Sequence, residues 1–481
     1  MLNRLFRKKD IGAMLEASSQ DNGGLHRNLT ATNLVTLGIG AIVGAGIFVI
    51  TGQAAAEYAG PALTISFAIS AVGCVLAGLC YAEFAAMIPV SGSVYAYCYT
   101  TMGEFLAWFI GWALVLEYLF ACSSVSSAWS GYMLNLLDGW GVHLPPQISQ
   151  STFIYLPESG WQWSGSLINF PAVFIVGILT ALLMGGIKQS ALINNVIVAI
   201  KVGVILLFVG FGLSYIDRSN WTPYIPANTG EYGHYGWSGI LRGAGIVFYA
   251  YLGFDALSTA AQETRNPQRD MPRGILISLG VCAVLYVAVT AVLTGIVHYT
   301  SLNVAAPIGV AIDQVPQLSW LSPFIKLGAI AGLSSVILVM MLGQSRIYYS
   351  IADDGLLPSF LARVHPVRGV PQRATILAGL ATALIAGLFP LQVLNELVSI
   401  GTLLAFTIVC LCVIVLRRTR PDLKRPFRVP WVPWLPLIGA LICVVQMLSL
   451  PWPTWARLII WTLIGLLIYF FYGIKHSHLN K

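Results

Sequence analysis

Long apolar stretches, bounded by charges, prolines and glycines, recur from one end of the chain to the other. Stretches of about 20 predominantly apolar residues predict helices that cross a membrane. Hydrophobic residues make up 57% of the sequence and charged residues only 9%, whereas soluble domains contain about 25% charged residues. So few charges cannot cover a water-facing surface, which excludes a soluble enzyme, a disordered protein and a nucleic-acid-binding module. Strands of an outer-membrane barrel alternate apolar and polar residues, so the continuous runs also argue against a barrel.

Apolar runs of at least ~17 residues predict twelve transmembrane helices, with counts of eleven and thirteen as alternatives. The predicted ranges are 31–54, 61–86, 103–137, 169–187, 190–215, 237–262, 274–299, 322–351, 374–389, 394–416, 432–450 and 454–473. The eight cysteines lie in or beside these runs without a CxxC pattern. We interpret them as reduced packing residues.

The positions of the basic residues predict the orientation, because Lys and Arg are retained on the cytoplasmic side of a membrane. With both termini cytoplasmic, 21 of the 26 Lys and Arg residues fall on inner segments and four at the outer side, while Lys201 lies inside the fifth predicted helix. The net charge of +7 therefore reflects topology rather than nucleic-acid binding. Residues 1–29 lack the apolar core of a signal peptide, so we expect a cytoplasmic N-terminal segment and a multi-pass protein of the inner (plasma) membrane.

Glycines interrupt the first and the sixth predicted helices, in GIGAIVGAGIF and in GAGIVFYAYLGFDALS. The first run alone fits either close helix packing or a helix break. Interruptions in two helices that lie five helices apart predict an inverted repeat of five plus five helices. Backbone groups freed by a break cannot be satisfied by lipid, so they must line a cavity.

The two breaks predict a site for a zwitterion. A carboxylate suits the N–H groups at a half-helix start near Gly44, Ala45 and Gly46. The carbonyls that we expect to receive an ammonium are those near Ile42, Tyr249, Ala250 and Leu252. An α-amino acid fits this arrangement, and another amine with a carboxylate would fit it equally.

Three charged residues fall deep inside predicted helices, where a charge costs at least ~2.5 kcal/mol. Lys201 lies near the midplane, where a low dielectric disfavours its charged form. We hypothesise that Lys201 carries a proton and substitutes for a bound cation beside the broken first helix; the alternative is a lysine paired permanently with carbonyls. Glu117 and Asp255 could face the permeation path, pair with a partner, or be protonated and structural. Glu83, near the inner end of the second helix, is interpreted as a structural acid.

Sequence motifs for nucleotide binding or catalysis are missing. No GxxxxGK[ST], no HExxH, no GxSxG with triad partners and no metal-ligand cluster occurs. We therefore expect a protein that is not an enzyme and that uses no cofactor and no metal.

Several segments resemble the amino acid–polyamine–organocation superfamily, and within it the bacterial members of the cationic amino acid transporter family. These segments are GIGAIVGAGIFVITG, YAEFAAMIPVSGSVYAY, GEFLAWFIGWALVLEY, FYAYLGFDALSTAAQETRNPQRDMPRGI, GQSRIYYSIADDGLLP and IGTLLAFTIV with RPDLKRPFRVP. The resemblance implies an all-α integral membrane protein with a leucine-transporter-type fold. Its first inverted repeat would span 30–216 and its second 217–418, with two peripheral helices in 419–481.

The resemblance also implies roles for individual residues. The family's substrate loops fall on Ile42–Gly46, which includes Val43, and on Tyr249–Asp255. The lysine of its proton-dependent members falls on Lys201, an acid of the third helix on Glu117, and a specificity position at about Met340.

Two of these positions bear on the substrate. Some bacterial relatives have Thr where this chain has Ala45, so backbone N–H groups alone would hold the carboxylate. Met340 offers no polar partner to a cationic side chain, which favours neutral or broad substrates over strict arginine or lysine selectivity.

We therefore expect a proton-coupled amino acid symporter that works by alternating access. An amino acid exchanger would use the same site and is the first alternative. A nontransporting membrane receptor is the second, and the buried charges and matched breaks argue against it. The expected partners are an amino acid, protons and membrane lipid, without nucleic acid, and a small membrane accessory subunit is left open.

Overall fold

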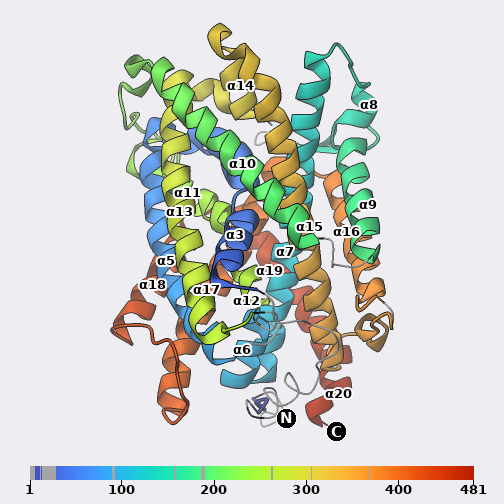
Figure 1. The fold of residues 1–481 in the computed structure, drawn as a ribbon. Coiled ribbons are helices and arrows are strands. Elements are labelled where there is room, and N and C mark those ends of the chain that lie inside the picture. Colours follow the sequence, from blue (N-terminus) through green and yellow to red (C-terminus); the bar gives the residue numbers. More distant parts are fainter. Residues whose placement is uncertain are drawn as a thin grey trace.

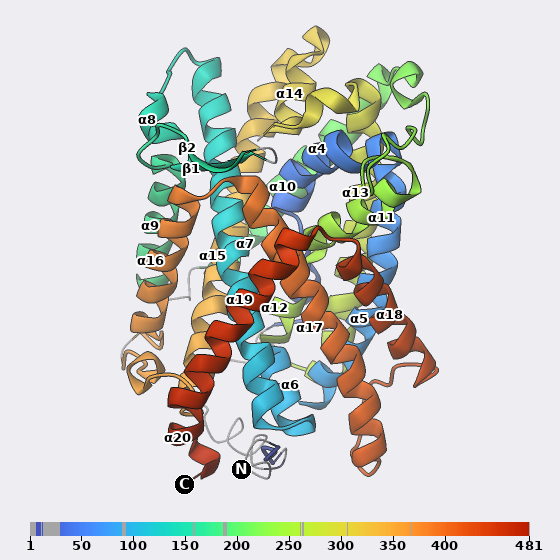
Figure 2. The ribbon, with the colours of Figure 1, turned by 180° about the vertical axis from the view of Figure 1, so that it is seen from behind.

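The computed structural model describes residues 6–10, 12, 29–88, 93–156, 159–185, 190–259, 261, 264–304, 306–366 and 368–480. Most of these residues form helices that stand side by side in a bundle (Figure 1). Two short strands, β1 (Phe153–Leu156) and β2 (Gly160–Trp163), pair antiparallel at one end of it (Figure 2). Of the predicted N-terminal segment 1–29, residues 6–10, 12 and 29 are described. Four basic residues assigned to cytoplasmic segments lie outside the described residues: Arg4, Arg27, Lys188 and Lys481.

Seven helical segments of the described chain are long and apolar enough to cross a membrane. They are Ala31–Met87, Glu104–Gly139, Asn195–Tyr215, Pro267–Ile296, Pro316–Asp353, Leu391–Thr419 and Trp452–His476. Three further apolar helices are shorter, namely Phe170–Gly185, Gln372–Leu388 and Trp434–Leu448. The chain is therefore largely helical and rich in apolar spans, as expected, while the count of twelve crossings stays a prediction.

The first long segment is not one continuous α-helix. Its successive parts are α3 (Ala31–Ile42), a π-helical turn (Gly46–Ile50), α4 (Thr51–Ala54), a second π-helical turn (Ala55–Ala59), a 3₁₀ turn (Gly60–Ala62) and α5 (Leu63–Met87). The break at residues 43–45 follows α3. A second interrupted helix consists of α11 (Gly236–Val247), a 3₁₀ turn (Phe248–Tyr251) and α12 (Phe254–Thr259). Both interruptions occur where the glycine-rich runs predict them.

The remaining helices surround these two. They are α6 (Ser93–Thr101), α7 (Glu104–Gly139), α8 (Pro146–Ser149), α9 (Phe170–Gly185), α10 (Ser190–Gly212), α13 (Pro267–Ile296), α14 (Pro307–Asp313), α15 (Ser322–Asp353), α16 (Gln372–Leu388), α17 (Leu391–Thr419), α18 (Trp434–Leu448), α19 (Trp452–Ile468) and α20 (Ile474–His476). Short 3₁₀ turns lie at Leu213–Tyr215, Arg218–Trp221, Tyr299–Leu302, Pro316–Leu321, Ser359–Ala362 and His478–Asn480, and a π-helical turn at Tyr469–Gly473.

Each predicted range overlaps a helix, but several boundaries differ. Helix α13 begins at Pro267, seven residues before the predicted start at 274, because proline is well accommodated at the first helical position and charged residues can continue a helix beyond the lipid. Helices α6 and α14 have 9 and 7 residues. The prediction required apolar runs of at least ~17 residues and therefore did not include them.

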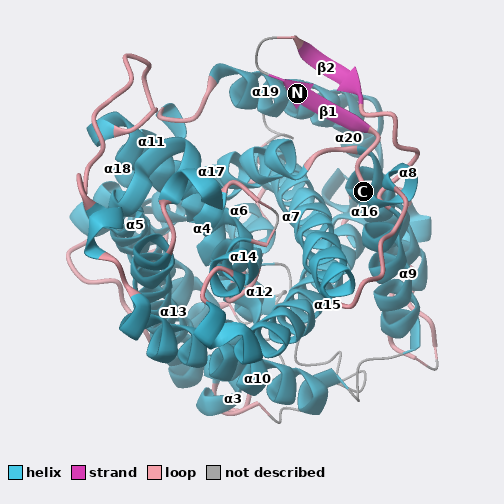
Figure 3. Cartoon of the chain, turned by 90° about the horizontal axis from the view of Figure 1, so that it is seen from above, coloured by secondary structure: helices cyan, strands magenta, loops and turns pink. Residues whose placement is uncertain are grey.

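The core of the bundle lies where α7 packs against α15 and α17, and where α13 packs against α3 and α5. Seen from above, α7 and α15 run through the interior, while α9 and α16 form a pair at one edge (Figure 3). In the span containing α19 only 22% of the apolar window is buried, against 78% in Ala31–Met87. The interrupted first helix is therefore the most enclosed of these spans, and α19 is peripheral.

Candidate functional site

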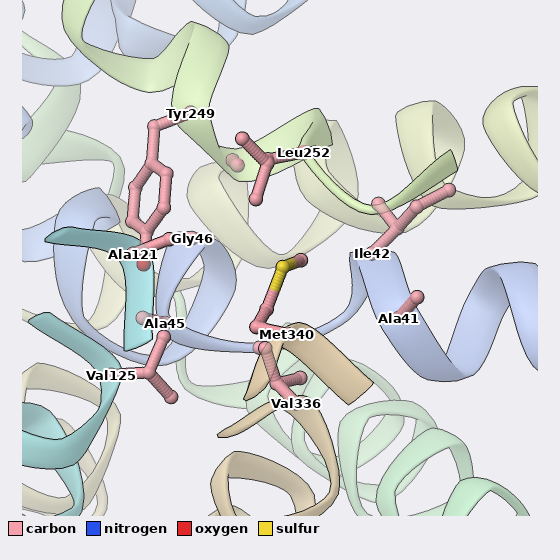
Figure 4. A pocket seen from close by; sticks show the side chains of 12 residues that line it. Ala41, Ile42, Ala45, Gly46, Ala121, Val125, Tyr249, Leu252, Val336 and Met340 are labelled. Atoms are coloured by element: carbon pink, nitrogen blue, oxygen red, sulfur yellow. The ribbon is translucent and has the colours of Figure 1, made fainter. Parts of the chain in front are cut away.

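The two interrupted helices meet at a small cavity in the interior (Figure 4). The empty space between its lining residues, including the part that is open to solvent, is about 230 Å³. The lining residues are Ala41, Ile42, Gly44, Ala45, Gly46, Ala121, Val125, Tyr249, Ala250, Leu252, Val336 and Met340. Among them Tyr249 alone has a polar side chain, and the Ser124 side chain of α7 lies beside its buried hydroxyl. The lining of the cavity is therefore almost entirely apolar.

Eight residues predicted to bind substrate line this cavity. They are Ile42, Gly44, Ala45, Gly46, Tyr249, Ala250, Leu252 and Met340. Val43, Glu117 and Asp255 are not among the lining residues, and neither is Lys201. Four lining residues escaped the sequence analysis because they are apolar residues in apolar helices: Ala41, Ala121, Val125 and Val336.

Glycine brings the two breaks together. A Cβ atom on Gly46 would lie 2.3 Å from the Ala250 Cβ and 2.4 Å from its Cα. Gly253, which follows the second break, has φ +117°, a conformation that side chains rarely adopt. A Cβ there would also lie 2.8 Å from the backbone of Ala41. Larger residues at either position would separate the first broken helix from the second.

The first break offers unpaired N–H groups. Helix α3 ends at Ile42, and Val43 is extended with ψ 100°. The carbonyl of Gly44 accepts from the N–H groups of Ile47 and Phe48 and so starts the second half-helix. Its start has no side-chain cap, and N–H groups of a first turn have no acceptor within the helix. Gly44, Ala45 and Gly46 lie at this start and line the cavity; the predicted contact of their N–H groups with a carboxylate stays a prediction.

Tyr286 of α13 joins the carbonyls of both breaks. Its hydroxyl oxygen lies 2.7 Å from the Ile42 carbonyl oxygen and 2.6 Å from that of Ala250. A tyrosine hydroxyl has one proton to donate, so two acceptors converge on a single donor. The sequence analysis missed Tyr286, because a tyrosine within an apolar run carries no distinguishing signal.

Lys201 contacts the broken helix from the side. Its Nζ, on α10, donates to the carbonyl of Gly40, to that of Val43 at 2.8 Å and to the Ser335 hydroxyl at 3.2 Å. The side chain is fully buried, and all three acceptors are neutral. The carbonyl end of a helix attracts a cation, so Lys201 occupies the place beside α3 where a bound cation would also be stabilised.

The two buried acids lie outside the cavity. Glu117 is one helical turn before Ala121 on α7, and the Thr402 side chain of α17 lies beside its carboxylate. Asp255 accepts from the Tyr118 hydroxyl at 2.5 Å and from the Gly253 N–H at 3.2 Å. Both acids are fully buried. Direct contact of either acid with a substrate stays a prediction.

Comparison with known proteins identifies the family. Residues 29–471 match the family model for amino acid permeases. The methylthioribose transporter of Bacillus subtilis (strain 168) is 46% identical over 480 residues, covering 100% of both chains. The branched-chain amino acid permease BcaP of the same organism is 44% identical over 482 residues, again covering 100% of both. The vacuolar cationic amino acid transporter 4 of Arabidopsis thaliana is 35% identical over 422 residues, which are 88% of this chain and 68% of that protein.

These matches confirm the resemblance found in the sequence. The relatives are named as transporters and permeases rather than as enzymes, and the structure supplies the apolar spans that such proteins need. The chain belongs to the amino acid permease family of the amino acid–polyamine–organocation superfamily and is an integral membrane transporter, not an enzyme.

Proposed function

We propose that the protein takes up neutral, predominantly apolar α-amino acids by proton-coupled symport. The observation that carries this proposal is the convergence of both helix breaks on a cavity whose side chains, apart from Tyr249, are apolar. Free N–H groups suit the carboxylate and the carbonyls of Ile42 and Ala250 suit the ammonium. Val336 and Met340 of α15 would then contact the substrate side chain. No lining residue offers a carboxylate to an arginine or lysine side chain.

Alternating access would follow from an inverted repeat. We assign twelve crossings to the chain, with 30–216 and 217–418 as the two repeats and 419–481 as the peripheral pair, all in the inner membrane with cytoplasmic termini. The breaks in the first and sixth helices support this arrangement. So do the excess of basic residues on the predicted inner segments and the peripheral position of α19.

Proton coupling is assigned to Lys201. In its protonated form it can donate three hydrogen bonds, and three acceptors surround its Nζ. Loss of the proton removes a donor and the charge that the end of α3 attracts. The broken helix would then be held less firmly, which links proton release to a change of conformation.

Uptake into proteoliposomes tests the proposal. Radiolabelled leucine, alanine and arginine are supplied outside with the exterior more acidic than the lumen. Leucine and alanine are expected to accumulate and arginine to accumulate less. Lys201→Ala should lower gradient-driven accumulation about tenfold or more, because it removes the group proposed to carry the proton; a tenfold change corresponds to about 1.4 kcal/mol. The matched control is Lys326→Ala, a second buried lysine that pairs with Asp313 at 2.8 Å and does not line the cavity.

Three outcomes would contradict parts of the proposal. Unchanged gradient-driven uptake by Lys201→Ala would remove its role in coupling. Uptake that needs amino acid inside the vesicles and ignores the pH gradient would identify an exchanger. Because one relative is named a methylthioribose transporter, unlabelled methylthioribose belongs among the competitors, and strong competition by it alone would reject an amino acid as the main substrate.

A further inference from the structure

The last turn of α17 and the loop that follows it toward α18 form the most basic short segment of the described chain. Residues 417–428 contain six Lys or Arg residues and a single acid, Asp422. We call this segment the basic loop. It projects at the periphery of the bundle, beside α18 and the lower end of α17 (Figure 2).

Part of the basic loop is fixed to the bundle by a buried acid. Glu83 of α5 is 2% exposed. Its carboxylate accepts from the Arg417 guanidinium at 2.6 and 3.1 Å and from the Val429 N–H at 2.7 Å, and the Arg425 Nε lies 3.5 Å away. Glu83 is therefore a structural acid, and it holds the loop in one conformation.

The other basic side chains face outward. Arg420 pairs with Asp422 at 3.3 Å. Arg418, Lys424 and Arg428 are exposed, and no carboxylate of the described residues lies within ion-pair distance of them. Three cations thus remain available at one place on the surface.

Exposed aromatic and aliphatic side chains follow these cations in the sequence. Trp431 is 81% exposed and Trp434 is 70% exposed, and tryptophan concentrates at the boundary between headgroups and acyl chains. Helix α18 then exposes Leu437, Ile438 and Leu441. The cations therefore lie at headgroup depth, next to a helix face that suits acyl chains.

We propose that the basic loop, together with Trp431 and Trp434, binds the phosphate headgroup of an anionic phospholipid. Clustered cations immediately beyond a transmembrane helix attract anionic lipid, and guanidinium groups bind phosphate oxygens with two parallel hydrogen bonds. A free anion or an acidic protein would use the cations but not the exposed face of α18. The fixed conformation supplied by Glu83 makes this a localised site rather than a diffuse charge.

Native mass spectrometry of the delipidated protein tests this site. Phosphatidylglycerol and phosphatidylcholine are titrated separately, with inorganic phosphate as a competitor. The variant R418Q/K424Q/R428Q removes three charges and is expected to weaken phosphatidylglycerol binding on the order of tenfold or more, with phosphatidylcholine binding unchanged. The matched control R363Q/R368Q/R373Q removes three exposed charges from the segment between α15 and α16 and from the first turn of α16, and it should change phosphatidylglycerol binding less than about twofold.

Three results would overturn the proposal: equal losses in the two triple variants, unchanged phosphatidylglycerol binding in the first, or displacement of the lipid by inorganic phosphate. A second variant, W431A/W434A, keeps every charge and should also release the lipid more readily. This variant still tests the site if the triple variant folds poorly. Unchanged lipid binding by W431A/W434A would show that the two tryptophans are not part of the site. None of these readouts depends on transport.

Discussion

At the scale of single residues, the site depends on glycine and alanine, which have little or no side chain, as much as on larger residues. Gly46 permits the first broken helix to touch Ala250, and Ala45 leaves the start of the second half-helix without a side-chain cap. The sequence predicted Gly46 because glycines are visible in an apolar run, and Ala45 because it lies between Gly44 and Gly46. It could not single out Val125, Val336 or Tyr286, because their importance comes from which helices pack together.

Gly46→Ala should separate the two breaks. The added methyl would lie 2.3 Å from the Ala250 side chain, and such overpacking costs about 1–3 kcal/mol. We expect a lower temperature of unfolding in detergent together with loss of substrate binding in a thermal-shift assay. Gly177→Ala on α9, where an added Cβ meets nothing within 4 Å, serves as the control. Equal behaviour of the two variants would show that the close approach is not needed.

Met340→Ala should change which substrates fit. The substitution enlarges the cavity on the side formed by α15, so apolar amino acids with longer or branched side chains should gain relative to alanine. The ratio of initial uptake rates for phenylalanine and alanine is the measurement. Met341→Ala, one position further along α15 and absent from the cavity lining, is the control. A ratio unchanged by Met340→Ala would place the substrate side chain elsewhere.

At the scale of helices, glycine patterns correctly located both interruptions, and apolar runs located the long helices. Helices α6 and α14 were missed because, with 9 and 7 residues, they are much shorter than the apolar runs that predict a membrane-crossing helix. The start of α13 was placed too late because charged residues were read as a boundary, although a helix continues through them. Hydropathy indicates where the chain leaves the lipid, whereas backbone hydrogen bonds determine where a helix begins and ends.

The stability of the C-terminal end of α3 should depend on Lys201 of α10. Lys201→Met keeps a side chain of similar length but removes the donors to the Gly40 and Val43 carbonyls. We expect faster amide hydrogen exchange at residues 44–48, because the broken helix loses a fixed contact. Lys326→Met, which disrupts the pair with Asp313 instead, should leave exchange there unchanged. Equal exchange in wild type and Lys201→Met would mean that packing alone holds the break.

At the scale of the whole molecule, two segments far apart in sequence pack together at one end of the bundle. Arg7 donates to the Leu479 carbonyl, and the Glu104 N–H donates to the Arg7 carbonyl. The fully buried Glu104 carboxylate accepts from the hydroxyls of Tyr99, Tyr469 and Ser477. Sequence could not reveal this association, because none of these residues belongs to a recognisable motif.

Deletion of residues 474–481 should destabilise this end. Glu104 would lose the Ser477 hydroxyl at 2.5 Å, and the Asp354 carbonyl would lose the His478 N–H at 3.1 Å. A hydrogen bond to a charged group contributes about 1.5–3 kcal/mol, so a clear drop in the unfolding temperature is expected. Deletion of residues 480–481 keeps both contacts and should have little effect. An unfolding temperature unchanged by the longer deletion would show that residues 474–481 do not stabilise the bundle.

The hydroxyl of Tyr286 has a consequence for how tightly any substrate can bind. This single proton already serves the two carbonyls of Ile42 and Ala250, so under the proposed function Tyr286 would compete with the ammonium of the substrate. Binding would then be an exchange of one neutral donor for a charged group with three, and the measured affinity would report only the difference. A transporter gains from that arrangement, since a substrate held by a small difference can be released again on the other side.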